Sequence, residues 1–160
     1  MIIEVEGDIL LSKAEVIAHG VAPNDNFSSG LALALRERWP GMYKDFRHYC
    51  KIASPKPGGL WSWAGPGGVR IVNLFTQEPP PTHEANPGKA SVKNVNNCLR
   101  SLEKEIAAEK FASVALPRLA TGVGKLDWDQ VKPLIQKHLG EARVPVYVYS
   151  TYRPGVQAKE

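Results

Sequence analysis

The feature that most constrains the fold is an alternation of short apolar, β-prone runs with longer amphipathic runs. Strand-like runs cover residues 2–5, 16–18, 113–116 and 143–149, and helical patterns cover residues 31–39, 42–51, 90–110 and 127–139. Two further β-prone runs, 60–63 and 69–75, flank a glycine-rich turn, which predicts a hairpin. Strands that alternate with helices form largely parallel sheets covered on both faces. We therefore predict an α/β fold: a three-layer α/β/α sandwich around a central mixed, mostly parallel sheet of about six strands.

Length and composition indicate one domain. The chain has 160 residues, of which 43% are hydrophobic and 22% charged, close to the average of globular proteins. This composition argues against disorder, rods and two separate cores. We assign residues 1–152 to a single domain and 153–160 to a polar tail that frays. Residues 78–88 (EPPPTHEANPG) contain four prolines and predict a surface loop.

Charge and cysteine content exclude several classes of protein. The 20 Lys and Arg residues outnumber 16 Asp and Glu, but they are scattered, so a phosphate-bearing ligand fits better than a dedicated nucleic-acid tail. Cys50 and Cys98 form no CxxC motif and have no paired histidine nearby, which predicts reduced thiols and no metal site; we expect no cofactor. The N-terminus lacks signal-peptide features, and no apolar run approaches roughly 18 residues. We expect a cytoplasmic monomer with no membrane partner.

Two of the strand-to-loop exits carry polar residues where an open α/β sheet usually binds its ligand. Asp8 follows the first strand, where it either contacts a ligand or caps a turn. His19 ends the second strand, as a ligand contact or as a hydrogen-bonded core imidazole. The small, polar loop that follows opens onto a helix at Gly30, and a helix N-terminus favours phosphate. Asn24 and Asp25 in that loop either serve the ligand or stabilise the turn.

The third exit carries the strongest signal. Residues 119–124 (LATGVG) follow a buried strand, and alternating glycines around Thr121 can form a backbone nest for a pyrophosphate. The segment is neither a GxxxxGK[ST] P-loop nor a GxGxxG fingerprint, so neither ATP nor a Rossmann dinucleotide is indicated.

In their chain order, these segments resemble a macro domain. The resemblance rests on GDIL (7–10), AH (18–19), SSGLALALRERWP (28–40), NLFTQ (73–77) and LPRLATGVGKLDWDQV (116–131). It spans residues 2–149 and is closest to the branch that holds terminal ADP-ribose protein glycohydrolases, DNA-de-ADP-ribosylating antitoxins and yeast-type ADP-ribose 1''-phosphate phosphatases.

The resemblance implies a role for each exit in binding ADP-ribose. Asp8 would accept a hydrogen bond from the adenine amino group, with Ile9 beside the base and Tyr149 or Tyr152 packed on it. The other implied ligand contacts are Ser28, Ser29 and Gly30 around the phosphates and distal ribose, and Thr121, Gly122, Val123 and Gly124 around the diphosphate. His19, at the second exit, stays among the predicted ligand contacts.

The chain departs from the glycohydrolases of this branch at their reactive positions. Gln77 stands where they use a lysine, and Gly124 where they use its partner aspartate; Ala22 and Ala32 also replace polar groups of related domains. An amide is not a nucleophilic amine, so a lysine-linked covalent intermediate is excluded. The remaining polar groups that could act on the distal ribose are Asn24, Asp25, Gln77 and His83, the last beside Glu84 in the proline-rich loop.

We therefore predict that the protein binds ADP-ribose and hydrolyses it from modified proteins by a substrate-assisted attack of water. Its partner would be ADP-ribose, an ADP-ribosylated protein or an ADP-ribosylated nucleic acid end. Three alternatives remain open: a non-catalytic reader or sensor of ADP-ribose, an ADP-ribose 1''-phosphate phosphatase, and nucleic-acid binding through the basic surface.

Overall fold

The structure, a computed structural model, describes residues 1–82 and 85–160. The strands are β1 (Ile2–Gly7), β2 (Val16–Val21), β3 (Leu60–Ala64), β4 (Arg70–Phe75), β5 (Val114–Leu116) and β6 (Val146–Tyr152). The helices are α1 (Gly30–Arg38), α2 (Pro40–Ala53), α3 (Val92–Glu109) and α4 (Trp128–Leu139), with short 3₁₀ turns η1 (Ile9–Leu11) and η2 (Pro66–Gly68). No helix in this described part is both long and apolar enough to cross a membrane.

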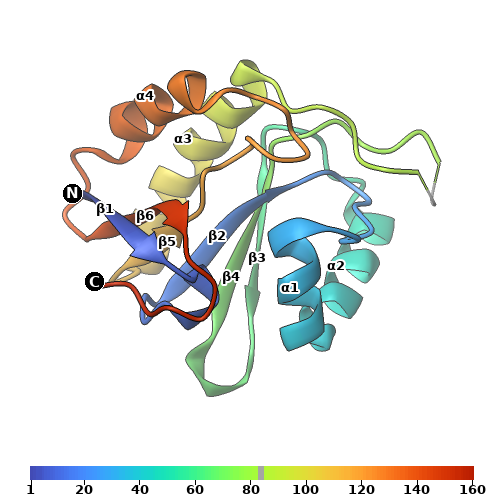
Figure 1. Cartoon of the computed structure of the whole chain (residues 1–160). Helices are drawn as coiled ribbons and strands as arrows, with labels where there is room; N and C mark the ends of the chain where they lie inside the picture. The colour runs from blue at the N-terminus through green and yellow to red at the C-terminus, as the bar shows by residue number, and fades with distance from the viewer. Residues whose placement is uncertain (83–84) are drawn as a thin grey trace.

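The six strands form one sheet in the order β1-β6-β5-β2-β4-β3. Every neighbouring pair is parallel except β3 with β4, which forms the predicted hairpin. The α/β sandwich with a mixed, mostly parallel sheet is thus confirmed (Figure 1). Because the parallel strands all end at the same edge, the loops that follow them are brought together there.

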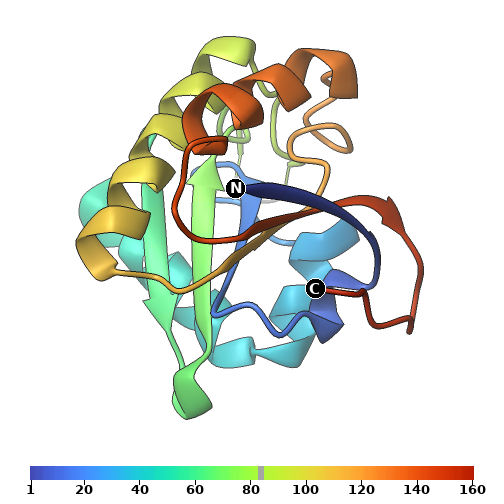
Figure 2. The same ribbon diagram turned by 90° about the vertical axis from the view of Figure 1, so that its left-hand side faces the viewer.

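Helices cover both faces of the sheet, as a parallel sheet requires (Figures 1 and 2). On one face, α3 and α4 pack through residues such as Leu99, Leu102 and Ile135 against Val16 and Ala18 of β2. On the other face, α1 and α2 pack against alternate residues of the same strands, including Val21 and Ile71. The period of two along β2 therefore assigns His19 to the α1 and α2 face.

The starts of α3 and α4 agree with the sequence patterns to within two residues, because local side chains cap them. Ser91 accepts a hydrogen bond from the Asn94 N–H and starts α3. Asp127 and Gln130 form a capping box that starts α4, at the beginning of the helical pattern over residues 127–139.

Two strands extend further than their β-prone runs. The ladder of β2 continues through His19 and Gly20 to Val21, because each residue from Val16 onward pairs with one of β4. Strand β6 runs to Tyr152 because it pairs with the end of β1, past an irregularity between Val5 and Glu6. Pairing between distant segments lengthened both strands beyond what their own composition indicates.

The expectation that the C-terminal tail frays was wrong. Arg153 donates its N–H to the Gly7 carbonyl at 3.0 Å, and the Asp8 N–H donates to the Val156 carbonyl at 2.7 Å. At the far end, the Glu160 carboxylate accepts hydrogen bonds from Ser12 and Tyr149. These partners lie far away in the sequence, so the polar composition of the tail could not reveal them.

Candidate functional site

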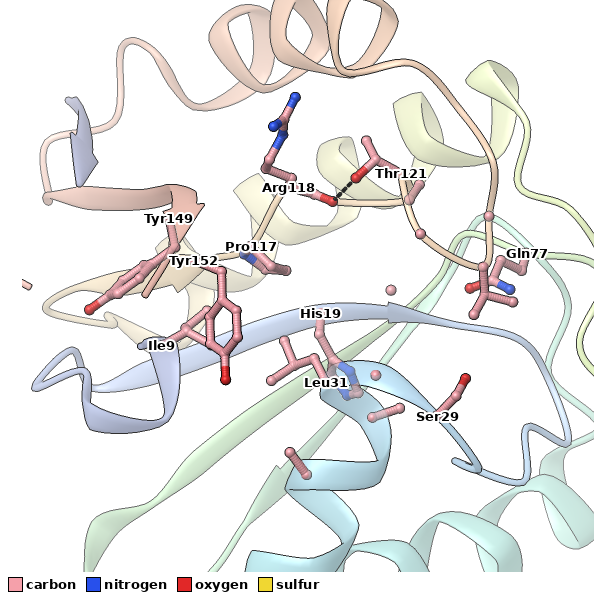
Figure 3. Close-up of a pocket in the computed structure, with 18 of the residues that line it drawn as sticks. Ile9, His19, Ser29, Leu31, Gln77, Pro117, Arg118, Thr121, Tyr149 and Tyr152 are labelled. Atoms are coloured by element: carbon pink, nitrogen blue, oxygen red, sulfur yellow. Dashed lines mark hydrogen bonds between the residues drawn. The ribbon is translucent and has the colours of Figure 1, made fainter. Parts of the chain in front are cut away.

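A cavity of about 550 Å³ lies at the edge of the sheet where the parallel strands end (Figure 3). It is lined by segments that follow β1, β4 and β5, by the start of α1 and by the end of β6. All of the predicted ligand contacts line it: Asp8, Ile9, His19, Ser28, Ser29, Gly30, Thr121, Gly122, Val123, Gly124, Tyr149 and Tyr152. Tertiary structure thus brings the three exits into one site.

One end of the cavity is built for a flat, partly polar group. In Figure 3, Tyr152 and Tyr149 lie beside Ile9 at this end. Ile9 is buried and Tyr152 is 66% exposed, so the Tyr152 ring is the one free to cover a ligand. Tyr149 is buried and donates its hydroxyl to Glu160; burial, together with that carboxylate, raises the pKa of the Tyr149 phenol.

Asp8 supplies the carboxylate at the same end. It is nearly buried, and its two oxygens accept the backbone N–H groups of Leu10 at 3.0 Å and Gly155 at 2.9 Å. It also caps η1, so both earlier interpretations of Asp8, cap and pocket residue, apply. A carboxylate has about four acceptor positions, which leaves this group free to accept from a ligand.

The loop between β5 and α4 presents unpaired donors to the middle of the cavity. Ala120 and Lys125 adopt positive φ angles of 62° at its two ends. The Leu126 N–H donates to the Ala120 carbonyl, and the Thr121 hydroxyl donates to the Arg118 carbonyl (Figure 3). Among the described residues, no hydrogen-bond acceptor meets the backbone N–H groups of residues 121–124. Such a row of free N–H groups is a nest for an anion.

The N-terminus of α1 faces the loop from the opposite side of the cavity. Ser29 precedes the helix without capping it through its side chain, and Ser29, Gly30 and Leu31 line the cavity. The first turn of a helix leaves its N–H groups without intrahelical partners and carries a partial positive charge. Gly30 has φ +61°, and a Cβ atom there would meet nothing within 4 Å. The position therefore favours glycine because of its backbone conformation and not because space is short.

A buried carboxylate holds the loop that leads into α1. Asp25 is 5% exposed, and its two oxygens accept the N–H groups of Ala22 and Phe27, both at 2.9 Å. Burial raises the pKa of Asp25, against the opposing effect of these two N–H groups. Asp25 therefore both stabilises the turn and lines the cavity.

Gln77 and Pro87 line the end of the cavity beyond the N–H groups of residues 121–124 and the start of α1. Gln77 is buried, and its side-chain N–H donates to the Gly88 carbonyl at 3.0 Å. This bond ties the strand exit of β4 to the proline-rich segment. The same segment meets the β5–α4 loop, where the Ala90 N–H donates to the Gly124 carbonyl at 3.1 Å.

Close packing explains why position 124 carries no side chain. A Cβ atom on Gly124 would lie 2.7 Å from the Ala120 carbonyl oxygen and 2.9 Å from the Ala90 Cβ. A Cβ atom on Gly122, two residues earlier, would meet nothing within 4 Å. Gly124 is thus fixed by packing, whereas Gly122 leaves the cavity open.

His19 is both a hydrogen-bonded core imidazole and a residue of the cavity wall, the two roles considered for it from the sequence. Its Nε2 lies 2.7 Å from the Asn73 Oδ1 on the neighbouring strand, and its ring meets Phe27 edge to face. The ring also lines the cavity. Burial lowers the pKa of His19 to about 4, only partly opposed by the Asn73 bond, so the imidazole is neutral near neutral pH.

Two of the four candidate catalytic residues line the cavity, namely Asp25 and Gln77. Asn24 does not: it is exposed, with φ +59°, and its carbonyl accepts a hydrogen bond from Arg47. His83, with Glu84, lies outside the described residues.

Sequence reasoning missed Pro117, Arg118, Leu31 and Pro87, which also line the cavity. The first two directly precede the predicted nest, and Leu31 directly follows Gly30, so their positions in the chain could have indicated them. The Arg118 guanidinium lies 5.3 Å from the centre of the Trp128 ring and points away from the cavity (Figure 3). Within the described ranges, no lysine lines the cavity and no cluster of three or more potential metal ligands exists.

Comparison with known proteins agrees with this arrangement. The model of the family described as Macro domain matches residues 28–135, which is more than half of the chain. The chain belongs to the macro domain family. The cavity is lined by residues of the matched segment and by residues outside it, among them Asp8, His19, Asp25 and the β6 tyrosines.

Several bacterial proteins are similar to this macro domain. It is 26% identical to a DNA ADP-ribosyl transferase-DNA ADP-ribosyl glycohydrolase fusion protein of Thermosipho africanus over 91% of this chain and 40% of that protein. It is 28% identical to a DNA ADP-ribosyl glycohydrolase of Mycobacterium tuberculosis over 82% and 37%, respectively. The chain thus spans about 40% of the length of these relatives.

A solved structure shares nearly the whole fold. The macrodomain of Thermus aquaticus DarG superimposes with a TM-score of 0.81 at 25% identity, covering 94% of this chain and 98% of that one. Thermosipho africanus DarTG in complex with ADP-ribose has the same TM-score at 20% identity, covering 98% of this chain and 42% of that one. The second likeness, at its low identity, concerns the fold alone.

The two glycines of the β5–α4 loop make a matched test of its packing. Gly124→Ala should lower the free energy of unfolding by about 1–3 kcal/mol, because the added methyl group overpacks the contact with Ala120 and Ala90. Gly122→Ala should change it by less than about 0.5 kcal/mol. Urea unfolding of the two variants measures both values, and equal effects would contradict the packing described.

The buried His19 predicts a loss of stability in acid. Its pKa is lowered in the folded state, so the unfolded chain takes up the proton first as the pH falls below about 6.5. The stabilisation associated with neutral His19 is complete above that pH and is lost progressively toward pH 4. His19→Gln, which stays neutral, should lose less free energy of unfolding between about pH 7 and about pH 4.5 than the wild type. Equal losses in urea titrations at the two pH values would show that His19 is not responsible.

Proposed function

We propose that this macro domain binds ADP-ribose in the cavity and hydrolyses the bond that joins ADP-ribose to a modified acceptor. The observation that carries the proposal is the order in which different kinds of chemical group line one cavity. An aromatic and carboxylate end is followed by two facing sets of unpaired N–H groups, and then by a buried polar end at Asp25 and Gln77. This order matches the order of base, diphosphate and distal ribose in ADP-ribose.

The base end suits adenine. The Asp8 carboxylate would accept from the amino group of the base, while Ile9 and Tyr152 would enclose its two faces. The ribose and diphosphate would then extend between the β5–α4 loop and the start of α1. Their charge would be met by backbone N–H groups, because Arg118, the cation among the described lining residues, points toward Trp128.

The distal ribose would lie near Asp25 and Gln77, where the bond to the acceptor breaks. We propose that water attacks the anomeric carbon, forming the new C–O bond as the bond to the acceptor breaks. One water proton stays on the new hydroxyl; the other passes to Asp25 and then on to the departing acceptor, so that Asp25 ends unprotonated and ready for the next turnover. Burial raises the pKa of Asp25, which makes its carboxylate a better base than an exposed one. The side-chain carbonyl of Gln77 would orient the water, since its amide N–H is held by Gly88.

Two classes of acceptor follow from two observations. The Thermosipho africanus and Mycobacterium tuberculosis relatives are named for DNA ADP-ribosyl glycohydrolase activity, which supports a modified nucleic acid. The open rim of the cavity, where Val123 is 44% exposed, would equally admit an ADP-ribosylated side chain. The proposed activity is therefore that of an ADP-ribosyl hydrolase. Modified DNA and modified protein are both tested as its substrates.

A non-catalytic reader of ADP-ribose is the second candidate. It is favoured by one observation: both oxygens of Asp25 already accept backbone N–H groups, so this residue has a structural role that explains its burial without catalysis. A reader would bind ADP-ribose and release nothing. The ADP-ribose 1''-phosphate phosphatase hypothesis would instead give inorganic phosphate.

Removal of the Asp8 carboxylate tests the base end. Asp8→Ala should weaken ADP-ribose binding by about 1.5–3 kcal/mol, because a charge-assisted hydrogen bond to the base is lost. Calorimetry measures the affinity. Asp129→Ala, which removes the same charge from the exposed first turn of α4, should bind like the wild type. Unchanged affinity in Asp8→Ala would remove this residue from the site.

Hydrolysis is tested by the release of free ADP-ribose from ADP-ribosylated DNA and, separately, from ADP-ribosylated protein. Asp25→Asn should lower kcat by roughly 10²–10⁴-fold, as loss of a general base does, and by more than it lowers the affinity for ADP-ribose, which reports the loss of one backbone acceptor in the loop before α1. Gly122→Glu should abolish both binding and turnover, because its side chain would enter the diphosphate region with a like charge. Tight binding without release from either substrate would leave the reader as the function.

A further inference from the structure

The C-terminal residues 153–160, here called the strap, fold back onto the base end of the cavity. The strap begins with a β-turn over residues 153–156, in which the Val156 N–H donates to the Arg153 carbonyl at 3.2 Å. Pro154 occupies the second position of the turn, and Gly155, with φ +71°, the third, which is the arrangement of a type II turn. The turn reverses the chain directly after Tyr152, the last residue of β6.

The strap contacts Asp8 through two hydrogen bonds. The Gly155 N–H donates to the Asp8 Oδ2 at 2.9 Å, and the Asp8 N–H donates to the Val156 carbonyl at 2.7 Å. The Leu10 N–H holds the other carboxylate oxygen, Oδ1. The carboxylate is therefore fixed from two sides, one local and one supplied by the strap.

Gly7 makes room for this contact. A Cβ atom at Gly7 would lie 2.8 Å from both the Ala158 nitrogen and the Val156 carbonyl oxygen, and its φ is +157°. Backbone atoms cannot give way as a flexible side chain can, so the strap could not lie here beside any other residue. The glycine before Asp8 thus serves the strap rather than a turn of its own.

The far end of the strap is anchored by one side chain. The Glu160 carboxylate accepts hydrogen bonds from the Ser12 hydroxyl at 2.6 Å, the Lys13 N–H at 2.9 Å and the Tyr149 hydroxyl. Gln157, between the two ends, makes only a long bond of 3.4 Å to the Leu11 carbonyl. The strap is otherwise exposed, apart from Ala158, which packs against the core near Tyr149.

We propose that the strap determines the base specificity of the cavity, by holding the Asp8 carboxylate in an orientation that accepts from a 6-aminopurine and repels a 6-oxopurine. A fixed carboxylate is an acceptor only, so it favours an amino group and opposes a carbonyl oxygen. A carboxylate free to turn could instead accept the N1–H of the 6-oxopurine. Gly155 and Glu160 are accordingly positioning residues. The inference rests on the proposed function, since it assumes that the base end receives the base of ADP-ribose.

Binding of two ligands to the full chain tests the strap. The ligands are ADP-ribose and its analogue with hypoxanthine in place of adenine. Wild type should prefer ADP-ribose by roughly tenfold or more, the equivalent of one hydrogen bond. Glu160→Ala, which removes all three anchoring bonds from an exposed position, should reduce the preference to about threefold or less, mainly through weaker ADP-ribose binding. Glu160→Gln, which keeps an acceptor, should restore most of it.

The matched control is Gln157→Ala, within the same strap but with one long hydrogen bond, which should keep the wild-type preference. A general loss of structure would weaken both ligands equally and leave their ratio unchanged. An unchanged ratio in Glu160→Ala, with ADP-ribose still bound by the wild type, would overturn the strap's role alone. Wild type that binds neither ligand would overturn the proposed function, and this inference with it.

A second measurement needs no ligand. Amide hydrogen exchange at Gly155 should accelerate by at least about tenfold in Asp8→Ala, which removes the acceptor of the Gly155 N–H, and in Glu160→Ala, which releases the far end of the strap. Gln157→Ala should leave that rate near the wild-type value. Equal Gly155 exchange rates in all four proteins would show that the strap and Asp8 are not coupled.

Discussion

The parallel pairing of β2 with β5 and β4 is the constraint on which the rest of the structure depends. Parallel strands buried between two helical layers must all end at the same edge. Loops that are far apart in the sequence therefore meet at this edge, and it is the sheet rather than contacts between the loops that brings them together. The hydrogen bond from His19 to Asn73 inside this ladder also holds the His19 ring, which lines the cavity.

Backbone groups, rather than charged side chains, dominate the middle of the cavity. The net charge of +4 indicates a phosphate-bearing ligand only loosely, because the basic side chains are scattered over the chain. The recognition chemistry comes instead from the N–H groups of residues 121–124 and the first turn of α1. Such donors need small residues nearby, as at Gly122, whereas the glycine at position 30 supplies the positive φ angle with which α1 begins.

The buried carboxylates of the cavity are both held by main-chain donors. Asp8 accepts from Leu10 and Gly155, and Asp25 accepts from Ala22 and Phe27. A carboxylate held in this way keeps its orientation while retaining capacity for a further partner. The two ends of the cavity thus use the same physical device, although one faces a base and the other the site proposed for bond cleavage.

The sequence by itself determined the layers of the fold, the hairpin, the capped helix starts and the membership of the cavity at Asp8, Gly30 and Thr121. Each of these depends on local periodicity, on a capping side chain or on glycines that follow a strand, all of which can be recognised within a few residues. Only the tertiary structure decided that Asn24 lies outside the cavity, that β2 continues through His19 and that the strap holds Asp8. Those features depend on hydrogen bonds between segments distant in the sequence, more than one hundred positions apart for Asp8 and Gly155, and local composition carries no record of such partners.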